Sequence, residues 1–202
     1  MRQPATAQAK TKSEQTGLIP KGHITYYIKG RTRIFEDFPM PKKKSAIDHL
    51  NSGRTPHIIH MIPKGAPGYA EARGGAMVVS SPAEVNDVIR KVQPGEVITL
   101  DDLRAVLARK HKVAVACPVS TAIFANMTAR AAEEMREHGV AFADLTPWWR
   151  VLRKGGFLNP KLPGGVARQA ALLQAEGVAS SPLRKELAVY DYESRRPDWC
   201  DE

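Results

Sequence analysis

The sequence predicts a mainly α-helical domain with small β elements, preceded by a basic extension. Two helices, expected over about 100–110 and 118–137, follow each other after a short connector, which is the outline of a helix-turn-helix. Apolar residues also recur with helical spacing over about 82–92 and 164–176. With 202 residues and 43% hydrophobic content, the chain can bury one core of ordinary domain size.

Positive charge is concentrated in the N-terminal part of the chain. Residues 1–80 contain 13 Lys and Arg against 5 Asp and Glu, whereas residues 81–202 contain 17 against 16. Such a basic field favours a polyanion, most simply nucleic acid, over an anionic membrane surface. We therefore expect nucleic acid to be a partner, with an affinity that falls steeply as salt rises.

Residues 1–22 contain almost no large apolar side chain and are expected to form a disordered basic arm. Residues 23–75 are expected to be an extended basic extension and linker, with two short strands hinged at Gly30. Three successive lysines in this region are candidate phosphate contacts, and a solvated surface cluster is the alternative. They are Lys42, Lys43 and Lys44.

The folded domain is expected to span residues 76–178, beginning with a short strand at Met77. A helix should follow Ser81, because Ser81 can cap it, proline fits its first turn and Glu84 can complete a capping box. The next helix should follow Thr99, which has Asp102 three residues further on.

The long helix over about 118–137 opens at Cys117-Pro118. Its apolar residues are expected to face inward, namely Val119, Ala122, Ile123, Met127 and Ala131. Its first half is the candidate reader of a nucleic-acid groove, because three glutamates in its second half would repel phosphate. The candidate groove contacts are Thr121, Asn126 and Arg130, with Thr128 and Arg136 as further polar side chains.

The final helix should end at Gly177, a typical helix C-cap. Residues 179–202 are expected to form a closing hairpin, with turn residues at 180–182, and a tail. Only two cysteines are present, too few for a disulfide framework, and no metal or cofactor is expected. The sequence has no membrane-spanning run or secretory signal, so we expect a cytoplasmic protein, associated with the nucleoid if it is bacterial.

Several motifs in the predicted domain resemble the C-terminal DNA-binding domain of the alkylguanine-DNA alkyltransferases. They are Pro94–Thr99, Pro147–Val151 and Leu172–Gly177, and the resemblance covers roughly residues 76–178. In that family a reactive cysteine accepts the alkyl group within the signature Pro-Cys-His-Arg-Val. Here Trp148 and Trp149 stand at the cysteine and histidine positions.

A branch of that family, the alkyltransferase-like proteins, carries Pro-Trp-His-Arg-Val and binds alkylated guanine in DNA without repairing it. The chain is similar to this branch in Trp148 and departs from it in Trp149. The resemblance implies a winged helix-turn-helix domain that binds DNA without acting as an enzyme. Leu100 and Cys117 stand where the family uses a tyrosine and an intercalating arginine, so base flipping in the family's manner is not expected.

The resemblance also implies roles for individual residues. Trp148 and Trp149 are candidates for stacking on an extruded base, and packing in the core is the alternative. Arg150, Arg153 and Lys154 are candidate phosphate contacts, with a role in surface solubility as the alternative. A buried polar network is expected to contain Asn126, Arg150 and Glu176.

Two other functions fit the same sequence. The first is an interaction or assembly module that keeps the fold and binds RNA or a protein through its N-terminal extension. The second is an enzyme that uses Cys117, whose thiol would precede a helix. In the favoured interpretation the protein is a monomer that binds duplex DNA and presents it to a repair protein.

Overall fold

The computed structural model describes residues 25–28, 31–34 and 44–201. The chain divides into two units, residues 1–43 and 44–202. In the first unit, β1 (Thr25–Ile28) and β2 (Arg31–Ile34) pair in an antiparallel hairpin. The predicted pair of short strands is thus confirmed. The predicted disordered arm, together with Lys42 and Lys43, lies outside the described residues.

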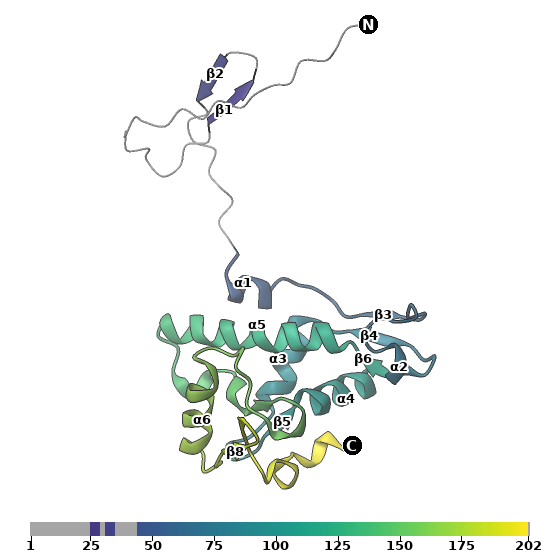
Figure 1. Cartoon of the computed structure of the whole chain (residues 1–202), viewed down its shortest axis with the longest axis vertical. Helices are drawn as coiled ribbons and strands as arrows, with labels where there is room; N and C mark the ends of the chain where they lie inside the picture. Colours follow the sequence, from purple (N-terminus) through teal and green to yellow (C-terminus); the bar gives the residue numbers. More distant parts are fainter. Residues whose placement is uncertain (1–24, 29–30, 35–43, 202) are drawn as a thin grey trace, which may run out of the picture. The chain divides into compact units, whose positions relative to one another are not determined.

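The second unit is mainly helical with small sheets (Figure 1). Its elements are, in order, α1 (Ala46–Leu50), β3 (His57–Ile59), α2 (Tyr69–Ala72), β4 (Met77–Val79), α3 (Pro82–Arg90), β5 (Ile98–Thr99), α4 (Leu100–Lys110), β6 (Val115–Ala116), α5 (Pro118–Glu137), β7 (Val151–Leu152), α6 (Gly165–Ala175), β8 (Ser181–Leu183) and β9 (Glu186–Ala188). Among the described residues, no helix is long and apolar enough to cross a membrane.

The predicted helix starts are confirmed by their caps. The Ser81 hydroxyl accepts a hydrogen bond from the Glu84 amide at the start of α3, and Thr99 forms a reciprocal capping box with Asp102 at the start of α4. The expected capping box at α3 is not closed. The Glu84 carboxylate instead lies 2.8 Å from His111 Nε2 and 2.6 Å from Lys110 Nζ, so it ties α3 to the end of α4.

The longest helix, α5, runs between α1 on one side and α3 and α4 on the other (Figure 1). Its buried face contains small residues that allow close approach, including Ala125, Ala129 and Ala132. Val119 and Ile123 are 48% and 53% exposed, and Ala122 is exposed as well, so the prediction that these three residues face inward is wrong. The packing partners, rather than apolarity alone, decide which face of α5 is buried.

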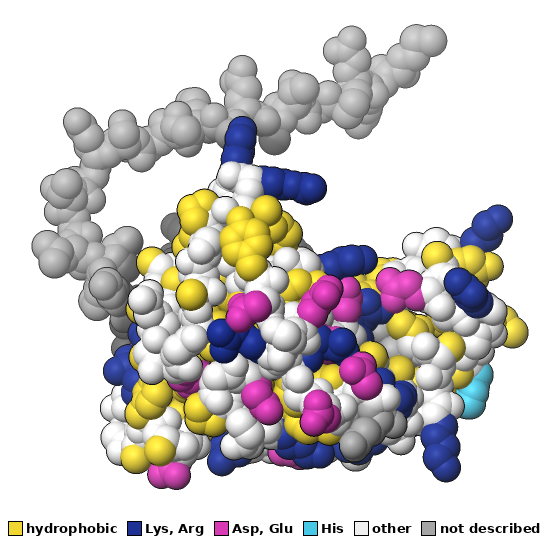
Figure 2. Space-filling view, turned by 90° about the horizontal axis from the view of Figure 1, so that it is seen from below, with side chains coloured by type: hydrophobic (Ala, Val, Ile, Leu, Met, Phe, Trp, Pro, Cys, Tyr) yellow, Lys and Arg dark blue, Asp and Glu magenta, His cyan; other side chains and the backbone are white. Residues whose placement is uncertain are grey.

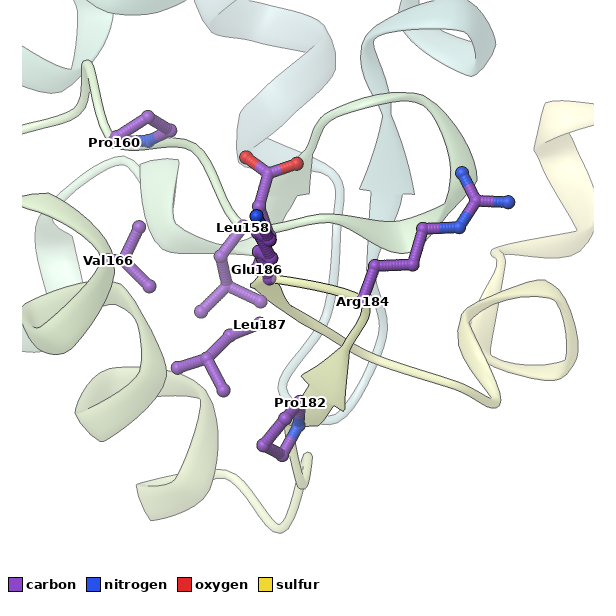
Figure 3. Close-up of a pocket in the computed structure, with 8 residues that line it drawn as sticks. Leu158, Pro160, Val166, Pro182, Arg184, Glu186 and Leu187 are labelled. Carbon is purple, nitrogen blue, oxygen red and sulfur yellow. The ribbon is translucent and has the colours of Figure 1, made fainter.

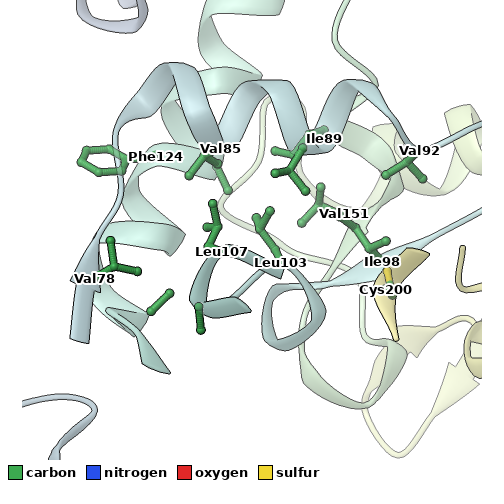
Figure 4. Packing of buried hydrophobic residues seen from close by; sticks show 14 residues of the cluster. Val78, Val85, Ile89, Val92, Ile98, Leu103, Leu107, Phe124, Val151 and Cys200 are labelled. Atoms are coloured by element: carbon green, nitrogen blue, oxygen red, sulfur yellow. The ribbon is translucent and has the colours of Figure 1, made fainter. Parts of the chain in front are cut away.

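Two hydrophobic clusters form most of the core. Figure 4 shows the first, in which Val85 and Ile89 of α3 meet Leu103 and Leu107 of α4. The second cluster joins α5, α6 and the 3₁₀ turn Trp148–Arg150, with Leu173 fully buried in it. The turn within the motif Pro147–Val151 is therefore built into the core.

Residues 44–75 belong to the compact unit rather than to an extended linker. The strand β3 pairs antiparallel with β4, and β4 pairs parallel with β6. Helix α1 packs on α5, and the Glu134 carboxylate accepts hydrogen bonds from the backbone amides of Ala46 (2.9 Å) and Ile47 (3.0 Å). This long-range contact explains why α1, a helix of only five residues, is formed.

The C-terminal region forms the predicted hairpin with a different turn. Strands β8 and β9 pair antiparallel, and the turn is made by Arg184 and Lys185 instead of residues 180–182. Gly177 adopts a φ of 76°, as expected for a residue that ends a helix in the left-handed region. The tail returns to α4, where Arg196 Nε lies 2.9 Å from Asp102 Oδ1.

Candidate nucleic-acid interface

Both indoles of the Trp148–Arg150 turn are buried, with exposed fractions of 1% for Trp148 and 2% for Trp149. Trp148 Nε1 donates to Glu133 Oε1 (3.2 Å), and Trp149 Nε1 donates to Glu176 Oε1 (2.9 Å). Phe142 stacks on Trp149 with 4.9 Å between ring centroids. Their faces are therefore occupied by protein, so core packing describes these residues better than stacking on an extruded base.

Arg150 anchors the same turn through a buried ion pair. Its Nε and Nη2 donate to the two oxygens of Glu176 at 2.8 and 2.6 Å, and its Nη1 donates to the carbonyl of Val92. Because the Arg150 side chain is buried and its donors are already bound by protein acceptors, Arg150 is held in one geometry and is not free to bind phosphate. Arg150 and Glu176 thus meet as the resemblance implied, with Trp149 as their third partner.

Asn126 does not join that network. Its side-chain amide donates to the carbonyl of Lys161 (2.6 Å), which ties the middle of α5 to the loop before α6. This bond places the exposed Lys161 next to the outward face of α5.

Gln169 has a positioning role that the sequence analysis missed. This fully buried side chain donates to the carbonyls of Trp149 (3.0 Å) and Val151 (2.9 Å), and it accepts from the amide of Asn159 (2.7 Å). Its spacing from Val166 and Leu173 puts it on the apolar face of α6. A glutamine on such a face is the signal that indicates a buried hydrogen-bonding role.

The outward face of α5 carries a different set of residues from the one predicted. Thr121 is fully buried and Thr128 is nearly so, and their hydroxyls therefore cannot reach a groove. The outward face instead presents the exposed Val119, Ala122 and Ile123, followed by Asn126 and the exposed Arg130. No charged residue occurs over 118–129.

Two of the three glutamates in the second half of α5, Glu133 and Glu134, are engaged in contacts. Glu133 Oε2 lies 2.8 Å from Arg168 Nη2 and 3.0 Å from Arg136 Nε. The two amide donors of α1 lower the pKa of Glu134 below its ordinary value and keep it ionised. The arginines therefore offset the charge of Glu133, whereas Glu134 keeps its charge and Glu137 is exposed.

The remaining candidate cations are dispersed. Arg153 pairs with Glu186 at 2.6 Å, while Lys154 and Lys44 are exposed. Figure 2 shows Lys and Arg interspersed with Asp and Glu over one face of the compact unit. No single-sign field covers that face, in agreement with the near balance of charge over 81–202.

Cys200 lacks the surroundings of a reactive thiol. Cys200 is buried, and this burial, with a further contribution from Asp102, raises the pKa of its thiol to about 11. Cys117 is half-buried at the N-cap of α5. Among the described residues, no group of three His, Cys, Asp or Glu side chains is placed to hold a metal ion.

Comparison with known proteins relates the helical domain to a protein family. Residues 81–178 match the family "6-O-methylguanine DNA methyltransferase, DNA binding domain". No curated protein matches the chain. A solved structure, Atl1 of S. pombe in complex with damaged DNA containing O6-carboxymethylguanine, is 17% identical with a TM-score of 0.40, covering 58% of this chain and 94% of that chain. The match over 81–178, together with the helices, caps and signature turn described above, identifies this part of the chain as a DNA-binding domain of the 6-O-methylguanine DNA methyltransferase family.

Proposed function

We propose that the protein is a non-enzymatic DNA-binding protein of the alkyltransferase-like type, which binds duplex DNA containing alkylated or otherwise modified guanine and transfers no alkyl group. The observation that carries the proposal is the buried Trp148 indole at the position where the family places its acceptor cysteine. Alkyl transfer needs a thiolate, and an indole nitrogen that donates to Glu133 is no nucleophile.

The two cysteines give no substitute acceptor. Cys117 lies at the N-cap of α5. In the sequence, the 20 residues of that helix and the loop after it separate Cys117 from the turn Trp148–Arg150. The raised pKa of Cys200 keeps its buried thiol protonated at neutral pH, which removes its nucleophilicity. The domain therefore keeps a DNA-binding frame without the group that reacts.

The proposed contact surface is the helix-turn-helix formed by α4 and α5. Val119 and Ile123 would make apolar contacts within a groove, because both are exposed on the outward face. Arg130 and Lys161 flank Asn126 and would bind the phosphates on either side. Lys44 and the basic residues before it supply further charge.

The absence of alkyl transfer can be measured directly. A duplex carrying one O6-methylguanine with a tritiated methyl group is incubated with excess protein, which is then precipitated and counted. We expect no label on the protein above that of a Cys117→Ser, Cys200→Ser variant. Stoichiometric label on the wild-type protein, lost in the double variant, would show that the protein is an alkyltransferase.

A second function is supported by the mixed charge of the domain surface. With 17 Lys and Arg against 16 Asp and Glu over 81–202, the domain has little electrostatic attraction for a polyanion. It would then act as an interaction module whose binding of RNA or protein depends on the N-terminal extension. Binding of duplex DNA by residues 44–202 alone would exclude this function.

A further inference from the structure

An open pocket lies between α6, the loop Leu158–Pro160 and the hairpin β8–β9. Its volume is about 430 Å³, and most of its lining is apolar. The apolar residues are Leu158, Pro160, Val166, Pro182 and Leu187. Figure 3 shows Leu158, Val166 and Leu187 clustered around the cavity, with the Arg184 guanidinium directed away from them.

The pocket is separate from the DNA-binding surface proposed above. Its lining includes neither the signature turn Trp148–Arg150 nor any residue of α5. Five of its eight lining residues come from residues 182–187, which follow the matched domain at 81–178. The pocket therefore depends on the C-terminal hairpin.

The rim of the pocket carries net positive charge. Arg184 and Lys185 form the hairpin turn, both are exposed, and neither makes an ion pair with any residue that the structure describes. The carboxylate of Glu186 is engaged by Arg153, with Nη1 and Oε1 2.6 Å apart. A ligand at this rim would thus meet two free cations beside an apolar cavity.

This chemistry favours a protein segment over a nucleic-acid base. A bound base needs an aromatic face for stacking or polar groups along its edge, whereas the lining has no aromatic ring and its one carboxylate is already paired. An aliphatic or aromatic side chain needs only the apolar contact that Leu158, Val166 and Leu187 offer.

We propose that this pocket is a docking site for an acidic segment of a partner protein. One large apolar side chain of that segment would occupy the cavity, and neighbouring Asp or Glu side chains would contact Arg184 and Lys185. The pairing of apolar anchor and charged rim gives both affinity and a choice of partner. This proposal does not depend on DNA binding by the domain.

The probe is a fluorescein-labelled peptide with one Phe flanked by two Asp on each side, titrated into the full-length protein and followed by anisotropy. We expect saturable binding that weakens at least about tenfold when Phe is replaced by Ser or Asp by Lys. The same loss is expected for R184E/K185E, which reverses the rim charge, and for Val166→Asp and Pro182→Asp, which place a carboxylate in the cavity. Pro182 is exposed, so its replacement tests the pocket even if Val166→Asp perturbs folding.

Arg73→Glu, which changes an exposed arginine of the turn after α2, is the matched control and should leave peptide binding within about twofold. No binding of the peptide, or equal binding by wild type and R184E/K185E, would overturn the proposal. It would also be overturned if the pocket variants lost affinity for a twelve-nucleotide oligothymidylate while peptide binding stayed unchanged, because the pocket would then be a nucleic-acid site.

Discussion

At the level of single residues, Trp148 and Trp149 show how two aromatic side chains of a short turn become part of the core. The sequence located this turn, but left open whether the indoles line a pocket or pack inside. Burial depends on contacts with Phe142, Glu133 and Glu176, which lie 7 to 27 residues from the tryptophan that each contacts. Such contacts have no local pattern, so only the structure could decide.

Trp148→Phe is expected to reduce stability without changing DNA affinity. The substitution removes the hydrogen bond to Glu133 and part of a buried ring, which together should cost about 1–3 kcal/mol of unfolding free energy. Urea denaturation measures this loss, and anisotropy with duplex DNA should give a Kd within about twofold of wild type. A large loss of affinity in a protein of unchanged stability would mean that the indole touches DNA.

The ion pair of Arg150 with Glu176 is expected to matter more than that of Arg153 with Glu186. Arg150→Met leaves Glu176 partly buried without its partner, which should lower the unfolding free energy by about 3 kcal/mol. Arg153→Met removes a more exposed pair and should cost less than about 1 kcal/mol. Equal effects in urea denaturation would show that the buried pair has no special structural role.

At the level of elements, local signals predicted α3, α4, α5 and α6, because each has a capping residue or a helical repeat of apolar side chains. The outward face of α5 and the docking of α1 were not predicted. Apolar Val119 and Ile123 suggested a buried face, yet α3 and α4 pack against other positions. Helix α1 has only five residues and depends on Glu134, which follows it by 84 positions or more, so no nearby signal marks it.

The docking of α1 on α5 is expected to weaken in acid. The amides of Ala46 and Ile47 lower the pKa of Glu134 below 4.5, its ordinary value, so this carboxylate stabilises docking above pH 4.5 and loses that effect as pH falls through its lower folded pKa. In ¹H–¹⁵N spectra, the two amide signals should titrate with a midpoint below 4.5. Glu134→Gln should abolish this titration, and Glu137→Gln, on the exposed side of α5, should not. A midpoint at or above 4.5 would contradict the assigned contact.

At the level of the whole molecule, the excess of positive charge and the helical domain lie in different parts of the chain. The helical frame lies within 44–201, whereas residues 1–43 contain 9 Lys and Arg against 3 Asp and Glu. Composition alone revealed this asymmetry, because charge can be counted without a structure. The pocket beneath the C-terminal hairpin was not predicted, since its lining comes from three separate segments.

Deletion of residues 1–43 is expected to weaken DNA binding and reduce its dependence on salt. Each lost phosphate contact should lower the slope of log K against log salt by about 0.9. Anisotropy titrations of residues 44–202 and of the full-length chain, at several salt concentrations, measure both slopes. Identical slopes would mean that the basic N-terminal residues make no phosphate contacts.

The most direct test of the proposed function is fluorescence anisotropy with two duplexes, one with a single alkylguanine and one unmodified. Each duplex is titrated with the wild-type protein and with Ile123→Glu, at two salt concentrations. We predict that the wild-type protein binds both duplexes and binds the modified duplex more tightly. Ile123→Glu should lose at least about tenfold in affinity, because a carboxylate on the outward face of α5 would repel phosphate. No binding by wild type, or equal binding by the variant, would contradict a DNA-binding role for α5.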